Sequence, residues 1–345
     1  MGIASARSLC VGLVAVVAAA AASGCSGSRE RSGETASLQK PPYQRLLRTL
    51  ASDGTSGAVA VVESPKGIWR GAAGWADSDA RRRARPTDRF AIEGVTQTFV
   101  AAVVLQLVQE RRLSLQDTVQ RWLPGLLRPR PKITVRELLN HTSGLPVDLN
   151  GGRPLREHLE AIAAAGVVND PGKSVVISYA NYVLLGLIVE KVTGRRLDRV
   201  VADRIFRPLH LESTSYGTER AKRISPWLGY PESLPAAGEI GIVSTSDDIA
   251  TFFRALMSGK VIGRELLSRM MQTVAVGAGN RRIGLGIIPR YRLSCGEAWG
   301  GGSDLGYSID IRVARDGSKA VVVARNNPSI GDADRVIEKM YCPVP

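Results

Sequence analysis

Between Phe90 and Phe99 the chain reads "FAIEGVTQTF", a glycine-marked turn that leads directly into a long apolar segment. A nucleophile at such a helix start needs a base close enough to accept its proton. Thr96 and Thr98 carry hydroxyl groups, but neither is followed by a base one helical turn later. Glu93 is the one ionisable group of the stretch, and a carboxylate at a helix start more commonly adjusts local electrostatics than activates water. The stretch therefore offers hydroxyls without a base.

No other segment supplies a recognisable nucleophile. The sole S-x-x-K sequence runs from Ser37 to Lys40, in a polar segment with nothing to position it. The chain contains neither a G-x-S-x-G nor an H-E-x-x-H sequence, so the nucleophile elbow and the zinc protease signature are excluded. Among the three histidines, His141 is interpreted as a structural hydrogen-bonding residue, and His158 and His210 as residues of polar helix or loop surroundings. We expect no metal and no cofactor.

The N-terminus has the pattern of an export signal. One positive charge at Arg7 precedes an apolar stretch from Leu9 to Ala22, which is too short and too alanine-rich for a membrane span. The following "ASGC" resembles a bacterial lipobox, so Cys25 is the predicted site of lipid attachment. Ordinary signal cleavage near the same position is the alternative. We assign residues 1–24 to the signal peptide and residues 25–42 to a lipidated tether.

The chain has a formal charge of +14, from 46 lysine and arginine residues against 32 aspartate and glutamate residues. The basic residues are mostly arginines spread along the whole length, which is typical of a solvated basic surface. No zinc-finger spacing or basic zipper accompanies them, so we expect no nucleic-acid partner. The predicted location is the cell envelope, on the outer face of the bacterial cytoplasmic membrane. The predicted partners are the membrane, through the lipid anchor, and a cell-wall peptide or protein.

Two of the four cysteines remain after export and lipidation. Cys10 leaves with the signal peptide and Cys25 is the lipid site, which leaves Cys295 and Cys342. Two such thiols in an exported protein can form a disulfide, here between a strand near the end of the fold and the C-terminal segment. The bond requires that their Cα atoms lie within bonding range.

Strands are predicted near both ends of the folded part of the chain. Residues 56–77 have the pattern of two strands joined by a turn from Pro65 to Gly67. Residues 307–326 alternate in polarity, turn at Asp316-Gly317 and continue as another strand. Residues 331–342 then predict a closing helix.

The middle of the chain is mainly helical. Apolar residues recur every fourth position after Val95, with further valines beside them, so this helix is apolar nearly all round and must be central. The order of elements predicts an α+β fold, in which an antiparallel sheet built from N- and C-terminal strands is flanked by helices and joined to a helical region. We assign residues 43–345 to one domain, with an α/β part at 43–90 and 285–345 and a helical part at about 91–284.

Five phrases are characteristic in combination: "FAIEGVTQTFVAAVVLQLVQERRLSLQDTVQRWLPG", "ITVRELLNHTSGLP", "NYVLLGLIVEKVTG", "PLHLESTSYG" and "GIVSTSDDIATFFRAL". Together they resemble the serine β-lactamase-like superfamily, and within it class C β-lactamases, D-alanyl-D-alanine carboxypeptidases and related esterases. The resemblance extends from about Gly57 to Asn326. It implies the β-lactamase/transpeptidase-like fold of penicillin-binding proteins, which agrees with the fold predicted from periodicity.

The resemblance implies acyl transfer by a serine at the start of the central helix, with a lysine one turn later as its base. Aligned without gaps, the serine position falls on Gly94 and the lysine position on Gln97. Glycine has no atom to acylate, and a glutamine amide does not titrate near neutrality. Both catalytic groups of the family are therefore absent.

The two other motifs of the family are also altered. The tyrosine of its Y-x-N motif falls on Ile177 and the asparagine on Tyr179. Tyr179 and Asn181 form a Y-x-N triplet two residues later, which restores the motif only if the loop slides. In the third motif the histidine or lysine position falls on Gly300, whereas Gly302 matches the motif glycine.

The sequence therefore favours a lipid-anchored pseudoenzyme that binds a ligand without cutting it. The backbone N–H groups of Gly94 and Ser303 could still form an oxyanion hole, since they do not depend on side chains. Two alternatives stay open: a hydrolase with an unrecognised nucleophile, and a protein-interaction scaffold with a closed cleft. We expect no catalytic residue, and the vestigial site comprises Gly94, Gln97, Ile177, Tyr179, Asn181, Gly300 and Gly302.

Overall fold

The computed structural model describes residues 42–79, 81–127, 132–147, 155–216, 241–277, 281–293, 295–304, 308–327 and 332–342. The predicted signal peptide, Cys25 and nearly all of the predicted tether lie outside these residues. Within the described ranges, no helix is long and apolar enough to cross a membrane.

Along the chain, a first group of strands is followed by a mainly helical region and then by a second group of strands, with one helix before the first group and one after the last. The strands are β1 (Gly57–Ser64), β2 (Gly67–Asp77), β3 (Arg82–Arg83), β4 (Phe90–Ala91), β5 (Ser215–Tyr216), β6 (Ile242–Ser244), β7 (Val274–Ala275), β8 (Arg282–Ile283), β9 (Ile288–Leu293), β10 (Gly296–Gly300), β11 (Gly302–Asp304), β12 (Ser308–Ala314) and β13 (Ala320–Arg325). The helices are α1 (Tyr43–Thr49), the 3-10 turn η1 (Glu93–Val95), α2 (Thr96–Gln109), α3 (Val119–Trp122), α4 (Val135–Leu139), α5 (Leu155–Ala165), α6 (Ala180–Thr193), α7 (Leu197–Val201), the π-helical turn η2 (Ala202–Phe206), α9 (Ser246–Met257), α10 (Arg264–Met270) and α11 (Ala333–Tyr341).

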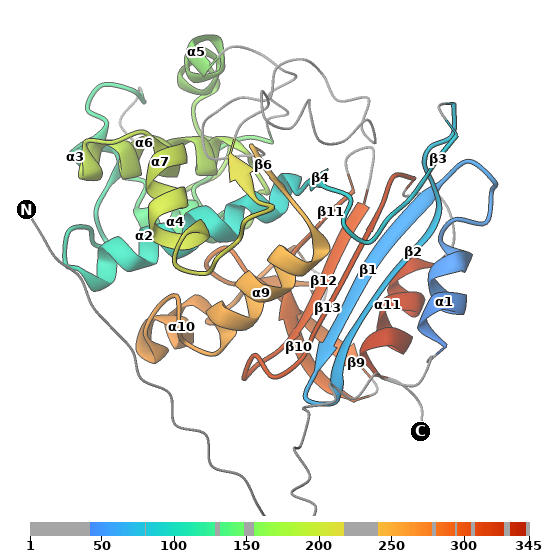
Figure 1. Cartoon of the computed structure of the whole chain (residues 1–345). Helices are drawn as coiled ribbons and strands as arrows, with labels where there is room; N and C mark the ends of the chain where they lie inside the picture. Colours follow the sequence, from blue (N-terminus) through green and yellow to red (C-terminus); the bar gives the residue numbers. More distant parts are fainter. Residues whose placement is uncertain are drawn as a thin grey trace, which may run out of the picture. The chain divides into compact units, whose positions relative to one another are not determined.

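Strands from both ends of the chain form one sheet. Its order is β3-β2-β1-β13-β12-β10-β9, and β11 pairs with β12 as a separate short strand after β10. β1 pairs antiparallel with both β2 and β13, so the first strand of the fold lies beside the last. Figure 1 shows this sheet next to the helical region that the middle of the chain forms. The predicted α+β fold, with its antiparallel sheet and helices, is confirmed.

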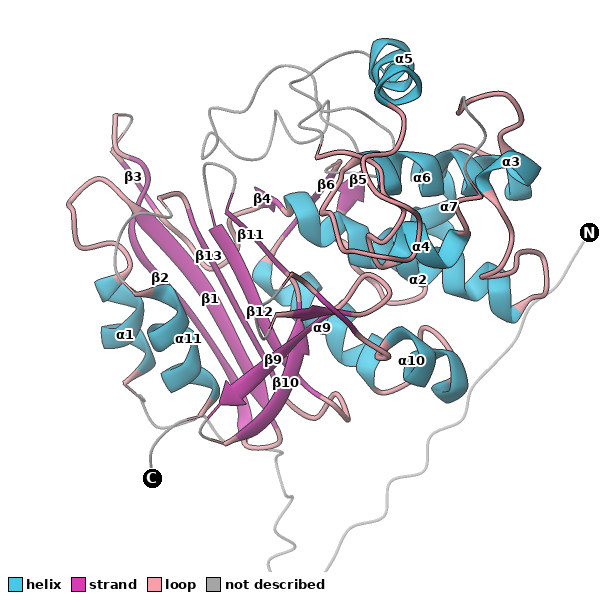
Figure 2. Ribbon diagram, turned by 180° about the vertical axis from the view of Figure 1, so that it is seen from behind, coloured by secondary structure: helices cyan, strands magenta, loops and turns pink. Residues whose placement is uncertain are grey.

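The central strands are buried on both faces, which explains their continuous apolar sequences. In β1, Val59 and Val61 pack into the core that includes α2 and α9, whereas Ala58 and Ala60 pack against α1 and α11. Figure 2 shows α1 and α11 together on one side of the sheet, with α9 on the other. Alternate residues of β1 therefore pack into two separate hydrophobic cores.

Helix α2 is the centre of the larger core, as its sequence predicts. All of its side chains from Thr98 to Leu105 are buried. Phe99 stacks on Phe252 of α9, with ring centroids 3.7 Å apart, and meets Phe206 edge to face. Because the sheet, α6 and α9 all pack around α2, the start of this helix is held in one place.

A tight loop follows α4 and carries His141. The Thr134 side chain and Glu137 form a capping box that sets the start of α4. After the helix, Gly144 has a φ of +77°, and a Cβ on it would lie 1.9 Å from the Asn169 carbonyl oxygen. Only glycine fits this approach. His141 is therefore presented by a loop that is fixed at both ends.

Cys295 and Cys342 form a disulfide in the structure, with Cα atoms 5.4 Å apart. Cys295 lies in the turn between β9 and β10, and Cys342 directly follows α11. The bond therefore ties one edge of the sheet to the helix that covers it.

Replacing both cysteines by serine is expected to lower the free energy of unfolding by about 4 kcal/mol, because the bond closes a long loop in the unfolded chain. Urea unfolding followed by tryptophan fluorescence measures this change. A reducing agent should bring the wild type to the same midpoint and leave the double variant unchanged. Equal midpoints for the oxidised wild type and the double variant would contradict the prediction.

Candidate functional site

The start of α2 lies against the sheet where β10 gives way to β11. η1 contains Gly94 and contacts β11, and Figures 1 and 2 both place β11 beside β4 near the first turn of α2. A Cβ on Gly301, between β10 and β11, would lie 3.6 Å from Val95 Cγ2 and 3.8 Å from Thr98 Oγ1. The structure therefore brings the family's serine position and its third motif together.

Glu93 lies in the first turn before α2 and is buried in the interior, and its role as an electrostatic feature of the helix start stays a prediction. Its exposed fraction is 0%, and its φ of +43° is in the left-handed region. A non-glycine residue there costs about 1 kcal/mol, so surrounding packing must hold it. The residue before Gly94 thus keeps a backbone conformation that a glycine would adopt without strain.

Gln97 makes a defined hydrogen bond with His141. Gln97 Oε1 lies 3.2 Å from His141 Nε2. On the other side of the ring, His141 Nδ1 lies 3.3 Å from the Ser178 backbone nitrogen and 2.9 Å from Asn181 Nδ2. A backbone N–H can only donate, so Nδ1 is an acceptor and Nε2 carries the proton. His141 therefore donates to the Gln97 carbonyl oxygen, and the Gln97 amino group is a donor directed elsewhere.

The environment of His141 keeps the ring neutral. It is 1% exposed, and burial lowers its pKa to about 4. With the proton on Nε2 and the lone pair of Nδ1 engaged by donors, the ring has no free acceptor to direct at position 94. His141 is therefore a structural hydrogen-bonding residue and does not replace the missing lysine as a base.

Asn181 belongs to the same buried network. It is fully buried, and its Oδ1 accepts from Ser143 Oγ at 2.5 Å while its Nδ2 meets His141. One turn along, the Tyr182 hydroxyl donates to the Leu139 carbonyl oxygen at 2.9 Å. These contacts fasten the start of α6 to the loop after α4. The Asn181 amide is thus committed to structure.

The ungapped alignment of the Y-x-N motif, which stays a prediction, puts Ile177 at the tyrosine position and Tyr179 at the asparagine position. Ile177 is 47% exposed and its side chain lines a pocket formed with β8 and β9. Tyr179 is half-buried at the N-cap of α6. The side chain at the family's tyrosine position therefore faces a cavity but carries no hydroxyl.

At Gly300, in the third motif of the family, the neighbouring strand leaves no space for a side chain. A Cβ on Gly300 would lie 2.1 Å from the Ile311 carbonyl oxygen in the neighbouring strand. Gly302 and Ser303 continue as β11, paired with Asp310 and Ile309 of β12. A histidine or lysine at Gly300 would require β12 to move. The role of the Gly94 and Ser303 backbone groups as an oxyanion hole stays a prediction.

The other titratable candidates lie away from this centre or inside the core. His158, which the sequence places in polar helix or loop surroundings, lies on α5 and is 0% exposed, because one face of this helix turns inward with Ile162. His210 is exposed, with a φ of +53°. In the described part of the chain, no group of three histidine, cysteine or acidic side chains could hold a metal ion.

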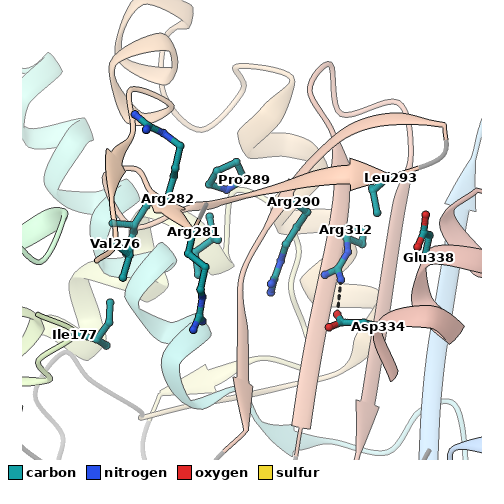
Figure 3. A pocket seen from close by; sticks show the side chains of 12 residues that line it. Ile177, Val276, Arg281, Arg282, Pro289, Arg290, Leu293, Arg312, Asp334 and Glu338 are labelled. Atoms are coloured by element: carbon teal, nitrogen blue, oxygen red, sulfur yellow. Dashed lines mark hydrogen bonds and ion pairs between the residues drawn. The ribbon is translucent and has the colours of Figure 1, made fainter. Parts of the chain in front are cut away.

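A pocket of about 450 Å³ beside Ile177 was missed by the sequence analysis (Figure 3). Four arginines line it: Arg281, Arg282, Arg290 and Arg312. The available signal was the presence of Arg290 and Arg312 inside strands, each next to or between apolar residues. A sequence pattern does not show that these strands and β8 direct their arginines to one hollow.

Lowering the pH from 7 to 5 is expected to remove about 2 kcal/mol of unfolding free energy through His141, because the unfolded ring has a pKa near 6.5 and takes up a proton that the buried ring refuses. This contribution is fully present above pH 6.5 and falls as the pH drops toward 4. Urea unfolding at both pH values measures it.

The comparison is between variants, because other groups also titrate in this range. His141→Gln should show a smaller loss of stability between pH 7 and 5 than the wild type. His210→Gln, at an exposed histidine, should behave as the wild type does. An equal loss in wild type and His141→Gln would show that burial of His141 does not set this pH dependence.

Comparisons with known proteins agree with this architecture. The Beta-lactamase family model matches residues 44–335. The D-stereospecific amidohydrolase from Streptomyces sp. is 31% identical, with a TM-score of 0.72, and the match covers 88% of this chain and 98% of that one. The penicillin binding protein from Bacillus halodurans, 21% identical, has the same fold, with a TM-score of 0.74 over 89% of this chain and all of its own.

Protein flp of Staphylococcus aureus is 29% identical over 184 residues, which cover 50% of this chain and 37% of that protein. The chain thus aligns with little more than a third of the length of this curated relative. The family model, in contrast, covers nearly the whole described fold. The chain belongs to the beta-lactamase family.

Proposed function

We propose that this protein is an exported, lipid-anchored binding protein of the beta-lactamase family that holds a cell-wall peptide without acyl transfer. The observation that carries the proposal is the state of positions 94 and 97. Gly94 has no side chain to acylate, and the Gln97 amide accepts a hydrogen bond from His141 where the family has a lysine. The serine and the lysine of the acylation step are thus replaced by a glycine and a neutral amide.

Neighbouring hydroxyls do not take over the reaction. Thr98 Oγ1 donates to the Gly286 carbonyl oxygen at 2.7 Å, so its proton is already engaged. Thr96 Oγ1 is buried and has no hydrogen-bond partner in the described residues, so no base stands ready to activate it. A threonine nucleophile needs such a base within hydrogen-bond reach. These contacts argue against the alternative of a displaced nucleophile.

The remaining groups suit the recognition of an oxygen acceptor. The amino group of Gln97 is a donor turned away from His141, and the backbone of Gly94 and Ser303 adds N–H groups that need no side chain. A peptide carbonyl or carboxylate is the matching ligand group. The Streptomyces relative is named for action on D-stereoisomers, so a peptide with D-residues, as cell walls contain, is the ligand class we favour.

No covalent adduct is expected on the wild-type protein after incubation with a penicillin, a cephalosporin or a fluorophosphonate, because position 94 has no nucleophile. Intact mass spectrometry measures the adduct, with an active β-lactamase as the labelled control. The Gly94→Ser, Gln97→Lys double variant should react with the fluorophosphonate, which would show that the probe reaches this position. A stoichiometric adduct on the wild type would overturn the proposal in favour of an enzyme.

Binding is tested separately from reactivity. Isothermal titration with an acylated peptide that ends in two D-alanines should give saturable binding, and the recovered peptide should be intact. Gln97→Leu, which removes the amide but keeps a similar volume, should weaken the binding by about tenfold, as expected for a lost hydrogen bond in a buried site. Absence of binding would instead favour a protein-interaction scaffold.

The lipid anchor is the second part of the proposal. Cys25 follows a short apolar segment and the sequence "ASG", and a polar tether separates it from the folded domain. One diacylated cysteine provides enough acyl chain for stable membrane attachment. The basic, exported chain would then be held at the membrane surface, close to the cell wall.

Metabolic labelling of cells with an alkyne fatty acid is expected to label the wild-type protein and not Cys25→Ala. The control is Cys10→Ala, whose substitution lies in the predicted signal and should leave labelling intact. Label that persists on Cys25→Ala, or its absence from the wild type, would reject lipidation at this residue.

A further inference from the structure

The arginine-lined pocket beside Ile177 is distinct in its chemistry from the Gly94 position. It lies between β8, β9 and the first turns of α11, and has a volume of about 450 Å³. Figure 3 shows the side chains of Arg281, Arg290 and Arg312 extending in the same direction, next to the ribbon of β9. This volume is within the range of small-molecule sites.

Two of the four guanidinium groups are committed to protein partners. Arg282 donates to Thr273 twice, from Nε to Oγ1 at 2.7 Å and from Nη2 to the carbonyl oxygen at 2.8 Å. Arg312 pairs with Asp310 and, at 2.9 Å, with Asp334. The charge of Arg312 is thus neutralised within the wall, although its buried Nε has no hydrogen-bond partner in the described residues.

The other two guanidinium groups retain donors for a ligand. Arg281 is exposed and its side chain has no hydrogen bond or ion pair with the described residues. Arg290 donates from Nη2 to the Gly301 carbonyl oxygen at 3.2 Å and lies 3.6 Å from Asp310, but its buried Nε has no partner in the described residues. A buried, unpaired N–H is costly unless something binds it.

The acidic groups of the pocket lie toward α11. Asp334 and Glu338 are on that helix, and Asp310 is shared by Arg290 and Arg312. Figure 3 shows Glu338 at the end of the pocket opposite Ile177 and Arg281. The excess positive charge is therefore at the Arg281 end.

Apolar side chains surround the same end. Ile177, Val276 and Ile283 lie near Arg281, and Ile288 and Pro289 of β9 extend this surface. Ile177 is among the few large apolar side chains that remain substantially exposed. A ligand that is only an anion would leave this apolar surface in water.

We infer that this pocket binds an anionic amphiphile, with a carboxylate or phosphate head on Arg281 and Arg290 and a short apolar chain against Ile177 and Val276. Guanidinium groups present planar pairs of donors that match both kinds of head group. The apolar chain gains from burial in proportion to its length, whereas a cationic head would meet the exposed, unpaired charge of Arg281. The inference stands whether or not the Gly94 position hydrolyses a substrate.

Isothermal titration of the purified wild-type protein with four probes tests the inference: octanoate, octyl phosphate, octylammonium and acetate. Octanoate or octyl phosphate, or both, should bind saturably, and the better one identifies the head group. Acetate should bind at least about tenfold more weakly, because it buries no chain. Octylammonium should not bind measurably.

Variants locate the binding. Arg281→Ala should weaken the better probe by about tenfold, since it removes an exposed, unpaired charge from the pocket without opening the core. Ile177→Asp, which places a carboxylate at the apolar end, should abolish binding. Arg45→Ala removes the same charge from the exposed face of α1 and should bind as the wild type does. Thermal unfolding checks that each variant remains folded.

The inference is overturned if neither anionic probe binds, if octylammonium binds as well as octanoate, or if Arg281→Ala and Arg45→Ala bind equally well. None of these outcomes bears on covalent labelling at position 94, so failure here is distinguishable from failure of the proposed function.

Discussion

The antiparallel pairing of β1 with β13 is the constraint on which the rest of the structure depends. It joins residues 58–63 to residues 320–325 and so unites strands from opposite ends of the chain. β12 and then β10 and β11 are placed by that pairing, and β11 in turn meets the first turn of α2. A slip of one residue would exchange the faces of β13 and remove Val322 and Ala324 from the core around α2. The site is therefore a product of long-range register.

The hydrogen bonds around position 97 are formed without a charged base. The ring of His141, held neutral by burial, connects the Gln97 amide to Asn181 and the start of α6. A lysine ammonium at position 97 would place a donor against the Nε2 proton of this ring. The network is thus matched to an amide, which makes the glutamine part of a consistent hydrogen-bond arrangement. Position 97 is therefore different from a site that lacks only its catalytic lysine and is otherwise unchanged.

The sequence was sufficient to predict the elements that a local pattern of residues specifies. α2 is apolar nearly all round and can only be central, and the turn at Asp316-Gly317 is a local signal for a hairpin. The burial of Glu93 and His158 was not predictable, because it depends on packing between elements far apart in sequence. The same holds for Arg281, which directly precedes β8, and Arg290 on β9, because they line the same pocket only after these segments have packed together. Local patterns identify elements, and long-range packing creates sites.

The close contact at Gly300 also bears on how this chain can change over evolutionary time. A serine at position 94 or a lysine at position 97 would each change one side chain. Position 300 differs, since a β-carbon there would meet the Ile311 carbonyl oxygen at 2.1 Å. A return to family chemistry therefore needs a strand to shift before the missing residue can be selected. Restoring the third motif of the family would therefore require a movement of the backbone as well as a change of side chain.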